Sequence, residues 1–73
     1  GVFGVPLVTI SFQTPSGGIT FDANGQVTSP LIMNFDTSLT PPRWVALPTF
    51  VNPVTGRLHT NERMLGNFAL VRQ

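Results

Sequence analysis

The chain has 73 residues, of which 41% are hydrophobic and only 10% are charged, and it contains no cysteine. This length allows a single domain, residues 1–73, and the sequence has no disulfide and no run of about 18 apolar residues that could span a membrane. The net charge of +1 comes from four scattered arginines and three acidic residues, which argues against a nucleic-acid binder because such proteins carry a clustered basic face.

Seven prolines and seven glycines interrupt the chain at short intervals. This spacing is typical of short strands joined by turns. The first strand is predicted over Leu7 to Phe12, where the side chains of Val8, Ile10 and Phe12 share one face. The following segment, Pro15 to Gly18, is predicted to be a turn or a flexible loop.

The segment Ile19 to Ser29 predicts a β-hairpin. Its turn would contain Asp22 in the first position and Asn24 in the third, followed by Gly25 in the left-handed region of backbone space. Each of these residue types suits the turn position that it occupies, so we predict a type I turn here.

The turn also predicts the register of the hairpin. A type I turn pairs Phe21 with Val27 and Ile19 with Ser29, whereas a two-residue Asn-Gly turn would place Asp22 opposite Val27. We prefer the first register because it keeps the apolar side chains on one face of the hairpin.

Two more strands are predicted in the middle of the chain. Leu31 to Phe35 alternates, Thr37 to Pro42 forms a loop, and Arg43 to Leu47 follows as a strand in which Trp44 points away from its neighbours. Pro48 ends this strand and predicts that it lies at the edge of a sheet or bends there.

Phe50 and Val51 are predicted to resume the strand after Pro48. Asn52, Pro53 and Gly56 then mark a turn, after which Arg57 to Thr60 would return antiparallel. The sequence therefore predicts two structural turns, one that begins at Asp22 and one that begins at Asn52.

The C-terminal part combines a short helical turn with a last strand. Asn61 is a residue that can cap a helical turn through Leu65, which Gly66 would end. Asn67 to Arg72 then alternates, with Phe68 and Leu70 on one face, and predicts the last strand.

The predicted fold is all-β, with about six short antiparallel strands. A domain of this size buries only roughly 60% of its unfolded surface, and small domains usually need disulfides, metals or oligomerisation. Because cysteine is absent and metal ligands are scarce, we expect the apolar surface to be completed by packing against other chains.

No residue pattern predicts an enzyme, a metal site or a cofactor. His59 and Glu62 could move protons as a pair, but no nucleophile motif accompanies them. Asp22, Asn24 and Gly25 look like the start of a calcium loop but lack its further oxygen ligands and closing glutamate, and turn chemistry accounts for all three.

The best candidates for an interface are Arg43 and Trp44, because Trp and Arg are enriched among interface residues that dominate binding. The alternative is that Trp44 lies in the core. Phe68 and Leu70 on the last predicted strand are the next candidates for contacts with other subunits.

Two stretches of the sequence carry a resemblance to a known family. Gly18 to Val27 reads GITFDANGQV, and Arg43-Trp44-Val45 is followed downstream by Thr55-Gly56-Arg57-Leu58. This order of a phenylalanine strand, a glycine turn, an R-x-V strand and a GR turn resembles the globular parts of type IV pilins, minor pilins and type II secretion pseudopilins. The resemblance covers about residues 18 to 60.

The resemblance implies a structural subunit of an extracellular filament at the cell surface. Pilins begin with a long apolar helix bearing a glutamate and often carry a disulfide, and this sequence has neither. The chain would then be a truncated head or the globular half of a split pilin, with self-copies and a short helical pilin chain as partners. The alternatives are a phage or virus module located in the virion, such as a fibre tip, decoration or small capsid protein, and a small ligand-binding or lectin-like β module.

Overall fold

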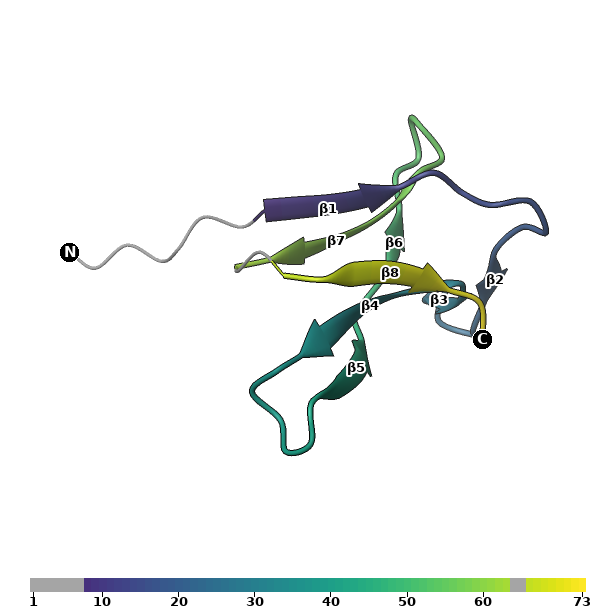
Figure 1. Cartoon of the computed structure of the whole chain (residues 1–73). Coiled ribbons are helices and arrows are strands. Elements are labelled where there is room, and N and C mark those ends of the chain that lie inside the picture. Colours follow the sequence, from purple (N-terminus) through teal and green to yellow (C-terminus); the bar gives the residue numbers. More distant parts are fainter. Residues whose placement is uncertain (1–7, 64–65) are drawn as a thin grey trace.

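The structure is a computed structural model that describes residues 8–63 and 66–73. All regular elements in these residues are strands, paired antiparallel, which confirms the all-β class (Figure 1). Leu7 of the first predicted strand and Leu65 of the predicted helical turn lie outside the described residues. The described strands are β1 (Val8–Phe12), β2 (Thr20–Phe21), β3 (Val27–Ser29), β4 (Leu31–Asp36), β5 (Arg43–Ala46), β6 (Phe50–Val51), β7 (Leu58–Glu62) and β8 (Phe68–Val71).

The described part of the chain thus has eight strands where about six were predicted. The hairpin contributes two of them, β2 and β3. Phe50–Val51 does not resume β5 after Pro48 but pairs in a different sheet, which adds a further strand. Proline cannot donate a backbone hydrogen bond to a ladder, so Pro48 is where the chain leaves one sheet for the other.

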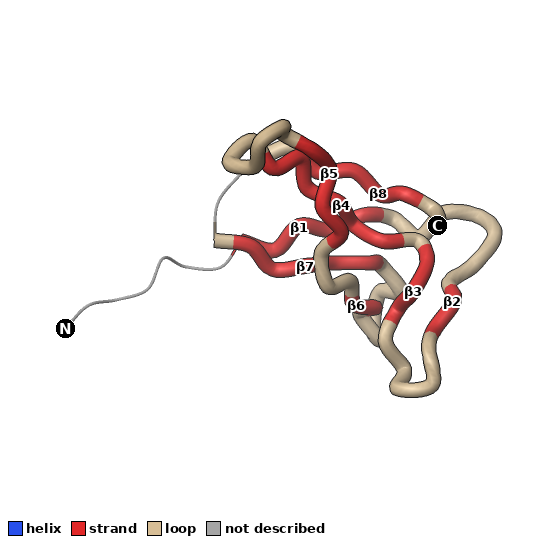
Figure 2. The backbone as a smooth tube through the Cα atoms, turned by 90° about the horizontal axis from the view of Figure 1, so that it is seen from below, coloured by secondary structure: helices blue, strands red, loops and turns tan. Residues whose placement is uncertain are grey.

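The strands form three sheets (Figure 2). In the first, which we call the β7 sheet, the order is β1-β7-β6, and in the second, the β4 sheet, it is β5-β4-β8. The third is the β2-β3 hairpin. Strands β5 and β8 are both edges of the β4 sheet, which agrees with the edge position that Pro48 predicted for the strand before it.

The turn of the β2-β3 hairpin is held by Asp22. The Gly25 N–H donates to the Asp22 carbonyl at 3.0 Å, and the Asp22 N–H donates to the Gln26 carbonyl at 2.9 Å. The Asp22 carboxylate accepts the N–H groups of Asn24 and Gln26, both at 2.9 Å. Gly25 has φ +79°, the left-handed region in which glycine carries no Cβ penalty.

The register of this hairpin agrees with the sequence at one pair and differs at the next. Phe21 lies opposite Val27, as predicted, but Thr20 and not Ile19 lies opposite Ser29. The predicted Ile19–Ser29 pair is wrong because β3 has one more residue than β2 between the two pairs, a β-bulge.

The turn between β6 and β7 contains Asn52, Pro53 and Gly56. The Asn52 N–H donates to the Arg57 carbonyl at 2.8 Å, and the Gly56 N–H donates to the Asn52 carbonyl at 2.7 Å. The Asn52 side-chain oxygen accepts the N–H of Val54 at 2.9 Å, and Gly56 has φ +74°. Asn52 therefore caps the turn with its own side chain, which is the reason that asparagine is favoured there.

Asn61 does not cap a helical turn. It lies in β7, opposite Thr9 of β1, and the Thr9 hydroxyl donates to its side-chain oxygen at 3.0 Å. The prediction from the sequence is wrong because pairing with β1, 52 residues away in the chain, extends β7 through Glu62. No local signal indicates such a distant partner.

The core lies between the β4 sheet and the β7 sheet and is small. Among the described residues, the buried hydrophobic side chains are Val27, Ile32 and Leu58, one from each sheet. Thr49 and Thr60 are buried beside them. The residues Val27, Ile32, Leu58 and Thr60 lie on strands and have more exposed neighbours in the sequence, as a strand with one face inward requires. Thr49 and the buried Pro30 lie outside the strands.

Thr49 connects the two sheets at the centre of this core. Its hydroxyl accepts the Ile32 N–H at 2.9 Å and donates to the Leu47 carbonyl at 3.1 Å. The Gln26 side chain reaches the Thr49 carbonyl at 3.0 Å. One hydroxyl thus satisfies a buried backbone amide at the point where β4 would otherwise have an unpaired N–H group.

We expect Thr49→Val to lower the free energy of unfolding by about 1–3 kcal/mol, because it leaves the buried Ile32 N–H without a partner. Urea denaturation followed by tryptophan fluorescence measures this change. Thr49→Ser keeps the hydroxyl and is the control, with a clearly smaller expected loss. Equal losses for the two variants would contradict the role of the hydrogen bond.

The loop Pro15 to Gly18, predicted as a turn or flexible loop, is fastened to the last strand. The Arg72 guanidinium donates to the carbonyls of Ser16 and Gly18, each at 3.1 Å. The Gln73 N–H donates to the Ser29 hydroxyl at 3.0 Å. These bonds attach the loop and the β2-β3 hairpin to the end of β8.

Candidate subunit interface

One face of the β4 sheet is entirely apolar. Alternate residues of β4 point to this side, and their cross-strand partners on β5 and β8 follow from the register. We call it the outer face because the buried Ile32 lies on the opposite side of the same strand. The outer face consists of Leu31, Met33 and Phe35 of β4, Trp44 and Ala46 of β5, and Ala69 and Val71 of β8.

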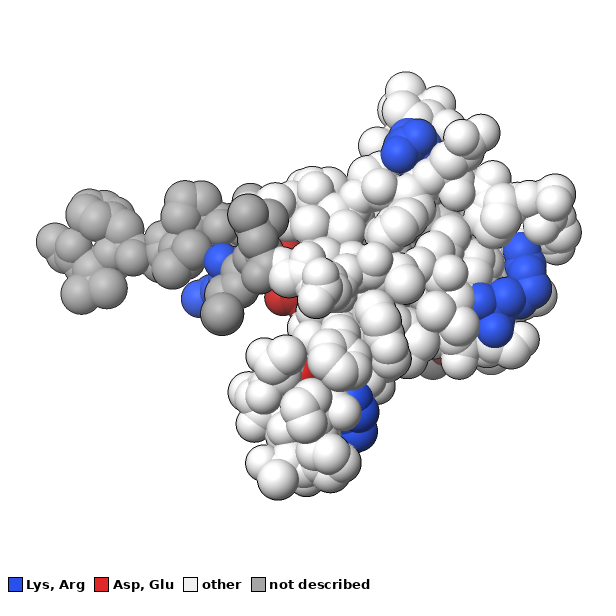
Figure 3. Space-filling model, in the orientation of Figure 1, with Lys and Arg blue, Asp and Glu red and all other residues white. Residues whose placement is uncertain are grey.

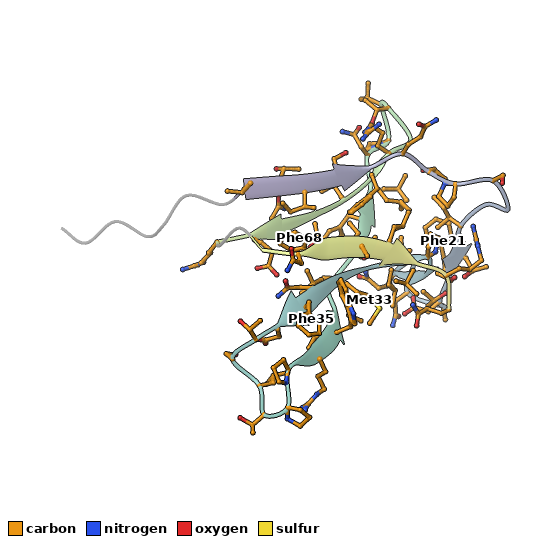
Figure 4. All side chains as sticks on the ribbon, in the orientation of Figure 1. Phe21, Met33, Phe35 and Phe68 are labelled. Carbon is orange, nitrogen blue, oxygen red and sulfur yellow. The ribbon has the colours of Figure 1, made fainter. Side chains whose placement is uncertain are left out.

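The outer face is open to solvent. Trp44 is 46% exposed and Val71 is 40% exposed, and Met33 and Phe35 are half-buried. Figure 4 shows Met33 and Phe35 near each other beside strand β4, in the direction of β5. Monomeric soluble proteins rarely expose a continuous apolar patch of this kind, and larger ones mark binding surfaces.

Trp44 is anchored on the outer face by Phe35. The two residues lie directly opposite each other across β4 and β5, with ring centroids 5.3 Å apart and an interplanar angle of 60°. Tilted aromatic pairs of this kind contribute about 0.5–1.5 kcal/mol beyond their buried area. The alternative that Trp44 is a core residue is wrong, because nearly half of its side chain is exposed. Its ring instead packs against Phe35 on the surface of the β4 sheet.

The other predicted interface residues lie on the opposite face. Phe68 and Leu70 are half-buried, and the register places Leu70 beside Ile32 on the inner side of the β4 sheet. Arg43 is exposed and pairs with Asp36 across the two strands, so it also lies on the inner side of the β4 sheet. The structure therefore does not bring these three residues together with Trp44.

Asp36 and Arg43 lie opposite each other at one end of the β4 sheet. Asp36 accepts hydrogen bonds from the Ser38 hydroxyl and from the Ser38 N–H, the latter at 2.9 Å. The side-chain bond from Ser38, its N–H group and the nearby Arg43 lower the pKa of the Asp36 carboxyl below its ordinary value. The ionised form of the carboxylate is thereby favoured, and its hydrogen bonds stay within its own loop.

The sequence contained part of the signal for this surface. The alternation of Leu31, Met33 and Phe35 places these three side chains on one side of a strand. Ile32 is apolar too, however, so the alternation alone does not say which side is buried. Ala69 and Val71 were missed because Phe68 and Leu70 are the larger side chains of the last strand.

The structure separates the residues considered for chemistry. His59 and Glu62 lie three positions apart on β7 and therefore point to opposite faces of the β7 sheet. The Asp22 carboxylate is occupied by backbone N–H groups of its own turn. Within residues 8–63 and 66–73, no three side chains of the His, Cys, Asp and Glu types are grouped as metal ligands.

Positive charge does not form a patch on the face of the molecule that Figure 3 shows, where the basic side chains are separated from one another. No helix long and apolar enough to cross a membrane is present in the described part of the chain.

Comparison with known proteins adds no relative. No protein-family model, no curated protein and no solved structure matches the chain.

Proposed function

We propose that this chain is a structural subunit of an extracellular filament that packs against other subunits through the outer face of the β4 sheet. The observation that carries the proposal is the combination of seven apolar side chains without one charge on a sheet face that residues 8–63 and 66–73 leave partly exposed. Uncovered apolar area of this kind is stabilised by burial in an assembly.

The energetics favour assembly over an isolated domain. The three buried hydrophobic side chains in the described residues are a small core, and no disulfide supplements it. Full burial of one large apolar side chain stabilises by roughly 1.5–3 kcal/mol relative to exposure. Covering the exposed parts of Trp44, Phe35 and Met33 therefore adds a fraction of this amount for each residue to what the small core contributes.

The resemblance to pilins supplies the kind of assembly. The residues that carry it form the β2-β3 hairpin, β5 and the β6-β7 turn. An uncharged, apolar sheet face suits a neighbouring copy of the chain or the apolar stripe of a short helical pilin chain. The location that follows is the cell surface. A phage or virus module in the virion is the second candidate, since the same face could be buried in a closed symmetric shell.

We expect the purified chain to self-associate at low micromolar concentration, measured by light scattering with size-exclusion chromatography. A folded monomer of 7.9 kDa at every concentration would contradict the proposal. Antibody labelling in electron micrographs of native material then decides the kind of assembly. Labelled filaments support the filament subunit, and labelled shells or tails support the virion module instead.

A further inference from the structure

The outer face of the β7 sheet is polar where β1 and β7 pair, in contrast to that of the β4 sheet. The register places Thr9 opposite Asn61 and Ser11 opposite His59, with all four side chains on this face. Together with Arg57 and the turn that begins at Asn52, they line a hollow of about 330 Å³. This hollow lies on the other sheet from the apolar outer face and is not used by the proposed function.

No carboxylate lines the hollow. Of the three acidic residues in the chain, Glu62 points to the inner side of β7, Asp36 lies at the end of β4, and Asp22 is bound in its own turn. Arg57 is therefore a positive charge without a negative neighbour in the hollow. An anion would meet attraction there and no competing acid.

The Arg57 side chain is held in one orientation. Its Nε donates to the Ser11 hydroxyl at 2.9 Å, which leaves both terminal nitrogens without a hydrogen-bond partner among the described residues. A guanidinium fixed through Nε presents a planar pair of donors, and this pair matches the two oxygens of a carboxylate or phosphate.

The other residues in and beside the hollow provide neutral groups that could contact the hydroxyl groups and the ring of a ligand. The side-chain oxygen of Asn61 accepts the Thr9 hydroxyl at 3.0 Å, which leaves the amide nitrogen as a donor. Phe50 does not line the hollow, but it is 43% exposed and its ring centroid lies 5.8 Å from that of His59, so an aromatic side chain lies next to one of the lining residues. Polar donors beside an aromatic face suit a small hydroxylated ligand.

We propose that this hollow binds the oxyanion group of a small ligand, with the Arg57 guanidinium as the main contact and Asn61 and His59 as further contacts. A carboxylate on an acidic sugar and a free inorganic phosphate share this chemistry. The exposed Phe50 ring beside His59 is expected to make binding of the sugar acid tighter than binding of phosphate.

The test titrates the purified Trp44→Ala chain, whose self-association is expected to be weaker, with glucuronate, glucose and inorganic phosphate, followed by two-dimensional NMR of the backbone amides at low ionic strength. Glucuronate is expected to shift the amides of Ser11, Arg57 and His59, and glucose, which lacks the oxyanion, is expected to shift them far less. If phosphate binds more tightly than glucuronate, the result supports an oxyanion-binding site whose preferred ligand is phosphate and not the sugar acid. Equal shifts with glucose and glucuronate, or none with either oxyanion up to millimolar concentration, would overturn the proposal.

Variants locate the binding. Arg57→Gln is expected to weaken glucuronate binding by about tenfold or more, as loss of a charged hydrogen bond does, and Arg57→Lys is expected to recover part of it. Arg43→Gln removes an equal charge from the β4 sheet and is the matched control, with unchanged binding expected. Asn61→Ala provides a second test if Arg57→Gln does not fold. Equal binding by Arg57→Gln and Arg43→Gln would show that the effect is one of net charge, and the site would be wrong.

Discussion

Leu58→Ala is expected to lower the free energy of unfolding by about 2–5 kcal/mol, as truncation of fully buried leucines does. Leu58 is 0% exposed and lies on β7, the central strand of its sheet, between Phe12 of β1 and Val51 of β6. Natural domains are stable by only about 5–15 kcal/mol, and a domain with this small a core is expected near the lower limit. The variant should therefore be unfolded over much of the temperature range in which the parent chain is folded.

Val54→Ala is the matched control for this experiment. Val54 lies in the turn between β6 and β7 and is 91% exposed, so its truncation should change stability by less than about 0.5 kcal/mol. Urea denaturation of both variants at one protein concentration measures the difference, since self-association makes stability depend on concentration. Similar losses for Leu58→Ala and Val54→Ala would contradict the position of the core.

The turns and the fold class could be predicted from the sequence because their causes are local. Asp22 and Asn52 form hydrogen bonds within their own turns, and Gly25 and Gly56 have the positive φ that the turns require. Such signals lie within a few residues of each other, so the sequence displays them directly.

The pairing of distant strands could not be predicted in the same way. Pairing with β1 keeps Asn61 in a strand, whereas local preference alone indicates a helix cap. Thr49 follows a proline in an irregular segment, and only the approach of β4 makes its hydroxyl a buried partner of Ile32. Contacts of this kind are set by the tertiary arrangement, which overrides local preference.

The candidate interface could be predicted from the sequence only in part. Alternation grouped Leu31, Met33 and Phe35 correctly, but Ile32 and Val45 are apolar on the opposite face, and either side could have been the buried one. Which face is outward depends on where the β7 sheet packs. The sequence thus has apolar residues on both faces of β4 and β5 and does not indicate which of the two faces the chain itself covers.

Trp44→Ala is expected to weaken self-association by about 2 kcal/mol or more, equivalent to roughly 30-fold in the dissociation constant. Trp44 is the largest exposed side chain of the outer face, and Phe35 holds its ring in place, so little conformational entropy is lost when a neighbouring subunit packs on it. Folding of the isolated chain should change less, by about the 0.5–1.5 kcal/mol of the Phe35–Trp44 pair. Sedimentation velocity across a concentration series measures the association, and a thermal melt of each variant establishes that it folds.

Phe50→Ala separates this surface from the other sheet. Phe50 is 43% exposed, close to the 46% of Trp44, and is also an aromatic residue on an edge strand, but it belongs to the β7 sheet. We expect it to leave self-association unchanged while removing the aromatic contact with His59. If folded Trp44→Ala protein associates like the parent chain, the outer face of the β4 sheet is not the interface. If Phe50→Ala weakens association more than Trp44→Ala does, the subunits meet through the β7 sheet, and the apolar face of the β4 sheet requires a partner other than a second copy of this chain.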